Sequence, residues 1–324
     1  MIKTAVIGVG HLGSLHCKAY KEIEGSRLVG IYDIDKNKSK DTADRFNVQS
    51  FKSLKELLEN CDAVSIATPT TEHFKTGICA VQAHKHILME KPITATIDEA
   101  EELLSAAEKE RVVLQVGHIE RFNPAFKAAR DYVDKPLFIE AHRLTQFAGR
   151  GTEVDVILDL MIHDIDLILK LVGEEPGEIR SAGAPVLTKT SDIANVRLEF
   201  PSGCTANITA SRISAHPMRK MRIFQKAGYI AIDFADRKTE IYLLAEDDKH
   251  SDHPAPIFRI PSGTKGKSID ILYPDIPKKD MLQEEIRNFI LSIEQGIKPE
   301  VDGNDGLRAL KVAIKIIEML PEPP

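Results

Sequence analysis

The densest group of chemically capable side chains in this 324-residue sequence lies between residues 155 and 166. On a helix, Asp155, Asp159, His163 and Asp166 would share one face, while the leucines and isoleucines between them pack elsewhere. An imidazole titrates near neutral pH, and a carboxylate four residues away can fix its tautomer and support its protonated form. The pattern indicates a general base. The structural alternative is a solvated acidic helix start with a histidine that bonds a neighbouring carbonyl.

A second group lies in Met89-Glu90-Lys91-Pro92, at the end of a predicted strand. Open parallel sheets bind ligands at the carboxyl ends of their strands, so Lys91 stands where an ammonium group can meet a substrate oxygen. A lysine before a proline is otherwise an ordinary surface residue in a turn. Its position at the strand end favours the functional interpretation.

A glycine motif, Gly8-Val9-Gly10-His11-Leu12-Gly13, follows an apolar run at residues 3–7 and precedes a predicted helix at 11–24. The first glycine permits a sharp turn, the second lets the backbone approach a pyrophosphate, and the third lets the helix lie close to its strand. Asp33 stands twenty residues after Gly13, at the end of a predicted strand. A carboxylate there accepts hydrogen bonds from a ribose 2'-hydroxyl and repels a 2'-phosphate, so NAD is expected rather than NADP. Lys36 and Lys38 are close enough in sequence to soften that repulsion.

The elements that position these groups alternate in residues 1–118. Strands are predicted at 26–33, 63–68, 86–89 and 112–117, with a helix at 98–110. This alternation predicts a doubly wound parallel sheet, the Rossmann fold, for an NAD-binding domain at residues 1–118.

Residues 119–324 have a different pattern, which predicts an α+β domain with a large, predominantly antiparallel sheet for substrate binding and oligomerisation. Helices are expected at 124–132, 156–171, 281–295 and 305–320, and strands at 137–144, 193–200, 205–211, 219–225, 228–233 and 239–244. Residues 246–280 are expected to be a surface excursion. The strand alternation is expected to divide Val196, Leu198, Ile208, Ile230 and Ile232 between two faces, and an exposed face would make a homo-dimer or homo-tetramer.

Composition limits the classes of function. Charged residues make up 28% of the chain, the formal net charge is -6, and acidic and basic residues are interspersed, so neither nucleic acid nor a membrane surface is an expected partner. No apolar run is long enough to span a membrane and no signal peptide precedes the first strand, which predicts a cytoplasmic protein. The four cysteines are scattered without metal-ligand spacing, so reduced thiols and no metal are expected.

Four motifs together resemble the glucose-fructose oxidoreductase, inositol dehydrogenase and rhizopine-catabolism family. They are the glycine motif, Glu90-Lys91-Pro92, the step Arg121-Phe122-Asn123-Pro124 into the second domain, and Asp159-x-x-x-His163-x-x-Asp166. The resemblance covers essentially the whole chain. It implies that Lys91, Asp159 and His163 form the active site beside the nicotinamide, and that Thr68-Pro69-x-x-x-His73 is a cofactor-side loop. The cofactor-binding residues are then expected to be Gly8, Gly10, His11, Leu12, Gly13, Asp33, Thr68, Pro69, His73, Glu90 and Lys91.

The sequence departs from many family members in two places. Glu153-Val154-Asp155 stands where a glycine-rich stretch is common, and Met161 stands where a glycine is common. The segments 117–124 and 158–164 resemble instead a subgroup of UDP-N-acetylglucosamine 3-dehydrogenases, which prepare 3-amino sugars for lipid A. That resemblance implies a nucleotide sugar as substrate, oxidised at C3.

Oxidation of a secondary alcohol requires removal of the hydroxyl proton and transfer of hydride from the same carbon to nicotinamide. We expect His163 to accept the proton, Asp159 to hold the imidazole, and Lys91 to stabilise negative charge on the oxygen. Lys91 as the proton carrier, oriented by His163, is the alternative. Arginines suit a pyrophosphate because they form paired hydrogen bonds, and the candidates are Arg121, Arg143 and Arg150, with Arg212 also considered.

Two other functions fit the same residues. One is a family enzyme acting on another sugar or on inositol, or running in the reductive direction. The other is a non-catalytic NAD-sensing regulator, which loss of the lysine and histidine would favour; both residues are present.

Overall fold

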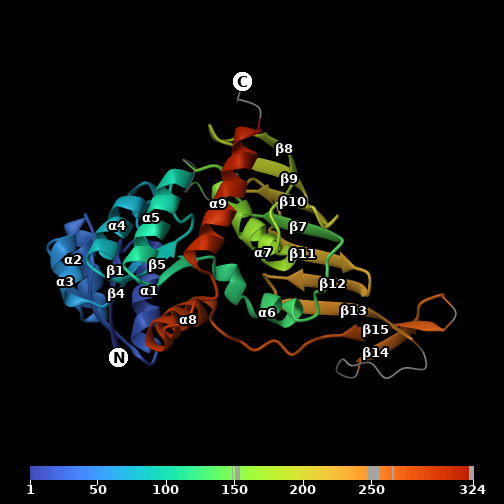
Figure 1. The fold of residues 1–324 in the computed structure, drawn as a ribbon, viewed down its shortest axis with the longest axis horizontal. Coiled ribbons are helices and arrows are strands. Elements are labelled where there is room, and N and C mark those ends of the chain that lie inside the picture. The colour runs from blue at the N-terminus through green and yellow to red at the C-terminus, as the bar shows by residue number, and fades with distance from the viewer. Residues whose placement is uncertain (148, 150–153, 247–255, 265, 321–324) are drawn as a thin grey trace. The chain divides into compact units, whose positions relative to one another are not determined.

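The computed structural model describes residues 1–147, 149, 154–246, 256–264 and 266–320. The chain forms two compact units (Figure 1). The first consists of Met1–Phe122 and Lys279–Lys311, and the second of Asn123–Lys278 and Val312–Pro324.

The first unit is built on a six-stranded parallel sheet with the order β3-β2-β1-β4-β5-β6. This is the strand order of a dinucleotide-binding fold, and it confirms the predicted Rossmann fold. Its strands are β1 (Ile2–Ile7), β2 (Ser26–Tyr32), β3 (Gln49–Ser50), β4 (Ala63–Ile66), β5 (His86–Glu90) and β6 (Leu114–Gly117). The sheet reverses its order between β1 and β4, which is where such folds bind their ligands.

Helices cover both faces of this sheet. They are α1 (His11–Glu22), α2 (Lys36–Phe46), α3 (Leu54–Asn60), α4 (His73–Gln82) and α5 (Ile97–Lys109), with the short η1 (Thr70–Glu72) and η2 (Ile119–Phe122). Local sequence fixes where several of them begin. Thr96 and Glu99 form a reciprocal capping box at the start of α5, and the Asp35 carboxylate accepts the Asn37 and Lys38 amides at the start of α2.

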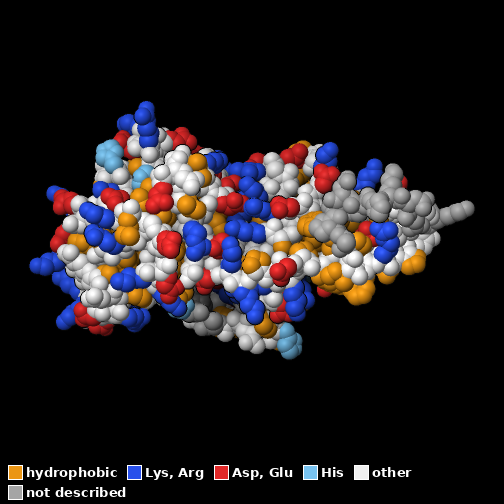
Figure 2. All heavy atoms as spheres, turned by 90° about the horizontal axis from the view of Figure 1, so that it is seen from below, with side chains coloured by type: hydrophobic (Ala, Val, Ile, Leu, Met, Phe, Trp, Pro, Cys, Tyr) orange, Lys and Arg blue, Asp and Glu red, His pale blue; other side chains and the backbone are white. Residues whose placement is uncertain are grey.

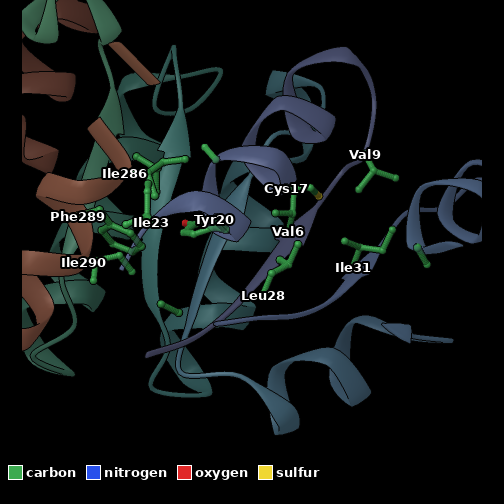
Figure 3. Close-up of a cluster of buried hydrophobic side chains, with 14 residues drawn as sticks. Val6, Val9, Cys17, Tyr20, Ile23, Leu28, Ile31, Ile286, Phe289 and Ile290 are labelled. Carbon is green, nitrogen blue, oxygen red and sulfur yellow. The ribbon is translucent and has the colours of Figure 1, made fainter. Parts of the chain in front are cut away.

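The helix α8 (Met281–Gln295), which is far along the chain, completes the hydrophobic core of the first unit. Its Ile286, Phe289 and Ile290 are buried with Tyr20 and Ile23 of α1 (Figure 3). The first part of α9 (Gly303–Glu318) also belongs to this unit, where Gly306 lies against Val116 of β6. The division therefore differs from the expected 1–118 and 119–324, because an apolar helix face from the C-terminal region is buried against the parallel sheet.

The second unit contains a nine-stranded sheet with the order β14-β15-β13-β12-β11-β7-β10-β9-β8. Neighbouring strands are antiparallel except β7 and β10, which are parallel. The strands are β7 (Phe138–Leu144), β8 (Glu178–Ala184), β9 (Ile193–Glu199), β10 (Thr205–Ser211), β11 (Met218–Gln225), β12 (Gly228–Asp233), β13 (Lys238–Glu246), β14 (Phe258–Pro261) and β15 (Lys267–Leu272). The predominantly antiparallel sheet confirms the predicted α+β architecture.

One face of this sheet is covered by helices. The helix α6 (Pro124–Arg130) packs against β12 and β13, while α7 (Ile162–Val172) and the π-helical turn η3 (Ile157–Met161) pack against β7 and β10 (Figure 1). The expectation that five apolar strand residues divide between two faces is wrong. All five are buried, because each alternates with a polar or aromatic neighbour on the other face: Val196, Leu198, Ile208, Ile230 and Ile232.

The other face carries a row of aromatic rings across four strands. Phe138 and Phe224 lie with ring centroids 5.8 Å apart, Phe224 and Tyr229 5.5 Å, and Tyr229 and Tyr242 4.3 Å. The side chains of this row alternate with the buried ones along each strand.

Two further strands stand within the segment expected to be a surface excursion. Phe258–Pro261 and Lys267–Leu272 pair as β14 and β15, and β15 extends the sheet from β13. Polar and apolar residues alternate from Ser268 to Ile271, a pattern typical of a strand. The proline, lysine and glycine residues around this short segment instead favour a loop, so the strand was not predicted.

Within the described parts of the chain, no helix is long and apolar enough to cross a membrane. On the face drawn in Figure 2, acidic and basic side chains are intermixed. All four cysteines are free thiols, and the described residues contain no cluster of histidine, cysteine and carboxylate side chains that could hold a metal ion.

Candidate active site

The glycine motif forms a tight turn between β1 and α1. Gly8 has φ +82°, and a Cβ atom there would lie 2.7 Å from the Ala67 carbonyl oxygen. A Cβ on Gly13 would lie 1.9 Å from the Gly8 carbonyl oxygen, so only glycine lets the helix approach the strand so closely. A Cβ on Gly10, by contrast, would meet no atom within 4 Å. This open space at the start of α1 is where the helix N-terminus can receive a phosphate.

Asp33 stands at the end of β2, where its carboxylate is fixed by two backbone amides. Its Oδ2 accepts the Val9 amide at 2.7 Å, and its Oδ1 accepts the Asp35 amide at 2.9 Å. The first bond ties Asp33 directly to the glycine turn.

A pocket of about 1130 Å³ extends over these elements. It is lined by most of the predicted cofactor residues: Gly8, Gly10, His11, Leu12, Asp33, Thr68 and Pro69. The residues fit NAD, because an open glycine turn for the pyrophosphate and a carboxylate for the ribose line the same pocket. Lys38 also lines this pocket, which agrees with its place in the sequence shortly after Asp33.

His73 was expected to contact the cofactor, but it is not among the residues that line the pocket. Its Nδ1 lies 2.9 Å from the Pro92 carbonyl oxygen and its Nε2 lies 3.0 Å from the Thr68 carbonyl oxygen. Burial lowers the pKa of His73, although both carbonyl groups oppose that shift. This buried ring therefore joins the cofactor-side loop to the segment that follows Lys91.

Glu90 and Lys91 stand at the end of β5, and the Lys91–Pro92 peptide bond is cis. The Lys91 amide donates to Glu90 Oε2 at 3.3 Å, while His16 Nε2 lies 2.9 Å from Glu90 Oε1. Burial raises the pKa of Glu90, but the hydrogen bond with His16 and the charge of Lys91 outweigh it and hold that pKa below its usual value. Sequence analysis did not single out His16.

In the second unit, Asp159 lies within the π-helical turn η3 and His163 in the first turn of α7. Both side chains are half-buried. Asp155 precedes the helix, so it does not share a helix face with Asp159 and His163 as expected. Its two carboxylate oxygens accept the Ile157 and Ser191 amides at 2.9 and 3.1 Å, so it fixes the start of the turn instead. Single π turns in helices are frequent at functional sites.

A buried ion pair, also missed from the sequence, supports this turn. Arg212 Nε donates to Asp192 Oδ1 at 2.8 Å, and Arg212 Nη1 donates to the Val154 carbonyl oxygen at 2.7 Å. Asp192 Oδ2 accepts the amides of Val186, Leu187 and Thr188. The pair therefore connects the loop before β9 to the residues that lead into the turn bearing Asp159.

The arginines expected to bind a pyrophosphate have other surroundings. Arg143 is buried and donates two hydrogen bonds to Asp164, at 2.7 and 2.9 Å, and Arg212 is committed to Asp192. Arg121 is also buried, with Nη2 3.5 Å from Asp305 Oδ1. Each of these three arginines therefore contacts a carboxylate of its own unit, and a role in binding a pyrophosphate stays a prediction. Arg150 lies outside the described residues.

Lys91 belongs to the first unit, and Asp159 and His163 belong to the second. The structure thus places each of the three on a defined element of its own unit. Their joint role as catalytic residues stays a proposal.

Comparison with known families gives two matches. The model described as "Oxidoreductase family, NAD-binding Rossmann fold" matches residues 2–118, and the model of the GFO/IDH/MocA C-terminal domain matches residues 117–231.

Individual relatives match over nearly the full length. A UDP-N-acetylglucosamine 3-dehydrogenase from Acidithiobacillus ferrooxidans is 36% identical, over 97% of this chain and 96% of the relative. A crystal form of that enzyme superposes with a TM-score of 0.88 at 35% identity, covering 98% of this chain and 97% of the other. A myo-inositol 2-dehydrogenase from Thermotoga maritima is 27% identical, over 99% of this chain and 97% of the relative.

These matches confirm the cofactor and the class of reaction expected from the sequence: the protein is an NAD-dependent dehydrogenase that acts on CH–OH groups. The chain belongs to the glucose-fructose oxidoreductase, inositol dehydrogenase and rhizopine-catabolism family of oxidoreductases.

Proposed function

We propose that this protein oxidises C3 of UDP-N-acetylglucosamine to the 3-keto sugar with reduction of NAD, and that this step supplies a 3-amino sugar for lipid A. The similarity to the Acidithiobacillus ferrooxidans enzyme, 36% identity over 97% of this chain, carries the proposal. The substrate is a small molecule, and no contact with nucleic acid or membrane is part of the function.

The chain's own residues divide the work of alcohol oxidation. The His163 imidazole accepts the proton of the substrate hydroxyl, and the Asp159 carboxylate holds that imidazole and supports its charged form. The Lys91 ammonium group stabilises the negative charge that develops on the oxygen. In the alternative assignment, Lys91 carries the proton and His163 orients it.

The cofactor site supports the remaining requirement. When bound, NAD supplies the acceptor for the hydride that leaves the substrate carbon. The turn at Gly8, Gly10 and Gly13 would hold the pyrophosphate, with Asp33 at the adenosine ribose. Thr68 and Pro69 would line the same pocket.

Oxidation of an inositol is the second candidate. The 27% identity to a myo-inositol 2-dehydrogenase over 99% of this chain favours it. A scyllo-inositol 2-dehydrogenase from Bacillus subtilis is also 27% identical over 97% of this chain.

Ligand-dependent thermal stabilisation of the NAD-loaded protein separates the two candidates, since a ligand that binds only the folded state raises the melting temperature. We expect UDP-N-acetylglucosamine to raise it, UDP alone to raise it less, and myo-inositol to leave it unchanged. A shift with myo-inositol and none with either uridine nucleotide would replace the proposed substrate with the inositol.

A further inference from the structure

A continuous line of polar side chains lies inside the first unit, behind the end of β5 that carries Lys91. Tyr20 Oη lies 2.7 Å from Ser65 Oγ, Ser65 Oγ lies 3.0 Å from His16 Nδ1, and His16 Nε2 lies 2.9 Å from Glu90 Oε1. Tyr20, Ser65 and His16 are fully or almost fully buried. None of the three lines the cofactor pocket, so its binding chemistry does not account for them.

The chemistry of these side chains determines which of them donates in each hydrogen bond. An ionised Glu90 can only accept, so His16 Nε2 donates to it. A neutral imidazole then accepts at Nδ1, and the Ser65 hydroxyl supplies that proton. Ser65 Oγ in turn accepts from the Tyr20 hydroxyl. This arrangement satisfies every group, and it ends with a negative charge on Glu90.

A second carboxyl group lies in the same interior. The side chain of Glu285 on α8 is completely buried, and neither of its oxygens has a hydrogen-bond partner among the described residues. The Gln115 side-chain amide donates to the backbone carbonyl oxygen of Glu285 at 3.0 Å, not to its carboxyl group. Burial, together with the nearby charge of Glu90, raises the pKa of Glu285 well above its usual value. Glu90 is partly buried and has donors, whereas Glu285 is fully buried without any among the described residues, so the two interacting carboxyl groups indicate one anion and one neutral acid.

The groups that influence Glu90 come from several elements. His16 lies on α1, Lys91 directly follows β5, His73 lies on α4, and Glu285 lies on α8. His16 and the Lys91 amide both make hydrogen bonds to the Glu90 carboxylate. The hydrogen bond from the Lys91 backbone amide ties the position of Lys91 to the charge of the Glu90 carboxylate.

We propose that His16 is a positioning residue for Lys91: with Ser65 and Tyr20 behind it, His16 holds Glu90 as the anion at the end of β5, while Glu285 is the neutral acid beside it. The proposal rests on the role proposed above for Lys91. The Glu90 anion then fixes the Lys91 backbone through its amide and attracts the Lys91 charge.

The first test requires no substrate. Protein labelled with ¹³C at the glutamate side-chain carboxyl carbon reports the protonation of each carboxyl group, with Glu90→Gln and Glu285→Gln used to assign the two resonances. At neutral pH, Glu90 is expected to be ionised and Glu285 protonated. His16→Ala should move the titration of Glu90 toward neutral pH by about one unit or more, since a hydrogen bond to a charged group is lost. His16→Gln can still donate to Glu90, so it should return the Glu90 titration most of the way to its wild-type position.

Kinetics supply the second readout. The acidic limb of the kcat profile should move upward in His16→Ala, with turnover at neutral pH lowered about tenfold and KM for NAD changed less. His86→Ala is the matched control, because that histidine lies at the opposite end of β5 and accepts the Val113 amide. His86→Ala should alter stability without moving the acidic limb of the kcat profile.

An ionised Glu285 in the wild-type protein, or an unchanged Glu90 titration in His16→Ala, would overturn the proposal. A drop in melting temperature with an unmoved kcat profile would also overturn it, since His16 would then be structural only. Near-normal turnover in Lys91→Ala, with both carboxyl titrations as expected, would remove the role proposed for Lys91 and leave the charge assignment standing.

Discussion

At the scale of single residues, Asp33 holds the backbone of the glycine turn, and we propose that it also binds the ribose of the cofactor. Its carboxylate accepts the Val9 amide of the glycine turn, so replacement by alanine removes a structural bond together with the charge. Asp33→Asn removes the charge and keeps an amide oxygen that can still accept from Val9, although it loses the bond from the Asp35 amide.

We expect both variants to bind NAD about tenfold or more weakly, since hydrogen bonds from the ribose to a charged acceptor are lost. Asp33→Asn should gain affinity for NADP because the repulsion of the 2'-phosphate is gone. Isothermal titration calorimetry with both cofactors measures this. Tighter binding of NADP than NAD by the wild-type protein would refute the role of Asp33.

Lys91 and His163 are the residues on which turnover should depend most. Lys91→Ala and His163→Ala are each expected to lower kcat by about two orders of magnitude or more, the scale of general acid–base and electrostatic effects. Calorimetric titration should show that NAD still binds. Near-wild-type turnover in either variant would exclude that residue from the mechanism.

The sequence identifies residues whose roles depend on local spacing, and misses those whose partners are distant. The glycine motif and Asp33 follow from spacing alone. His16 looks like an ordinary helix residue, because its partners Ser65 and Glu90 are 49 and 74 residues away. Arg143 fits a phosphate ligand by residue type, and only the fold reveals its partner Asp164, 21 residues away.

At the scale of elements, the loop before β9 and the turn η3 depend on the Asp192–Arg212 pair. Both side chains are buried, so removal of one leaves an unpaired charge or polar group in the interior.

Asp192→Asn is expected to cost about 3–5 kcal/mol of unfolding free energy. Burial raises the pKa of Asp192, but hydrogen bonds from three amides and Arg212 outweigh it and hold that pKa far below its usual value. The stabilisation that the Asp192 carboxylate provides is therefore fully present above the pKa of an unfolded aspartate, near 4. It is lost as the pH falls toward the pKa of Asp192 in the folded protein.

Urea unfolding at several pH values tests this, with Glu178→Gln as the control. Glu178 pairs with Arg180 at 2.8 Å on the surface, where solvent screens the charges, so its loss should cost far less stability than the loss of Asp192. Equal effects of the two substitutions, or an Asp192 effect that persists unchanged into strong acid, would contradict the assignment.

Regular elements follow the sequence closely, and irregular ones do not. The strand Thr205–Ser211 and the helix Met281–Gln295 have the predicted bounds, because apolar periodicity and a capping Asp280 define them. The π turn Ile157–Met161 has the composition of an ordinary helix, so nothing local distinguishes it. Its start depends on Asp155 and Ser191, which only the fold brings together.

At the scale of the whole molecule, we propose that the second unit's sheet forms a homo-dimer or homo-tetramer through the face that carries Phe138, Phe224, Tyr229 and Tyr242. Aromatic residues are enriched at protein interfaces, and these four form a continuous row. A hollow of about 630 Å³ lies on the same face, lined by Glu140, Arg222 and other side chains. A second copy of the chain is the expected occupant.

Light scattering at micromolar concentration should give a dimer or tetramer, and Tyr229→Lys should shift it toward monomer by placing a charge in the aromatic row. Leu187→Lys, at an exposed position outside that row, is the control and should leave the mass unchanged. A monomeric wild-type protein would refute the proposed assembly.

The central claim concerns the substrate. A 3-keto sugar lies energetically uphill when NAD is the oxidant, so little NADH accumulates unless the product is removed. The decisive measurement incubates the protein with NAD and UDP-N-acetylglucosamine in the presence of hydroxylamine, and identifies the trapped product by mass spectrometry and NMR. We predict an oxime at C3 of the sugar, formed with stoichiometric NADH and absent with Lys91→Ala. Absence of any trapped nucleotide sugar, alongside NADH formation with an inositol or a free sugar, would contradict the account.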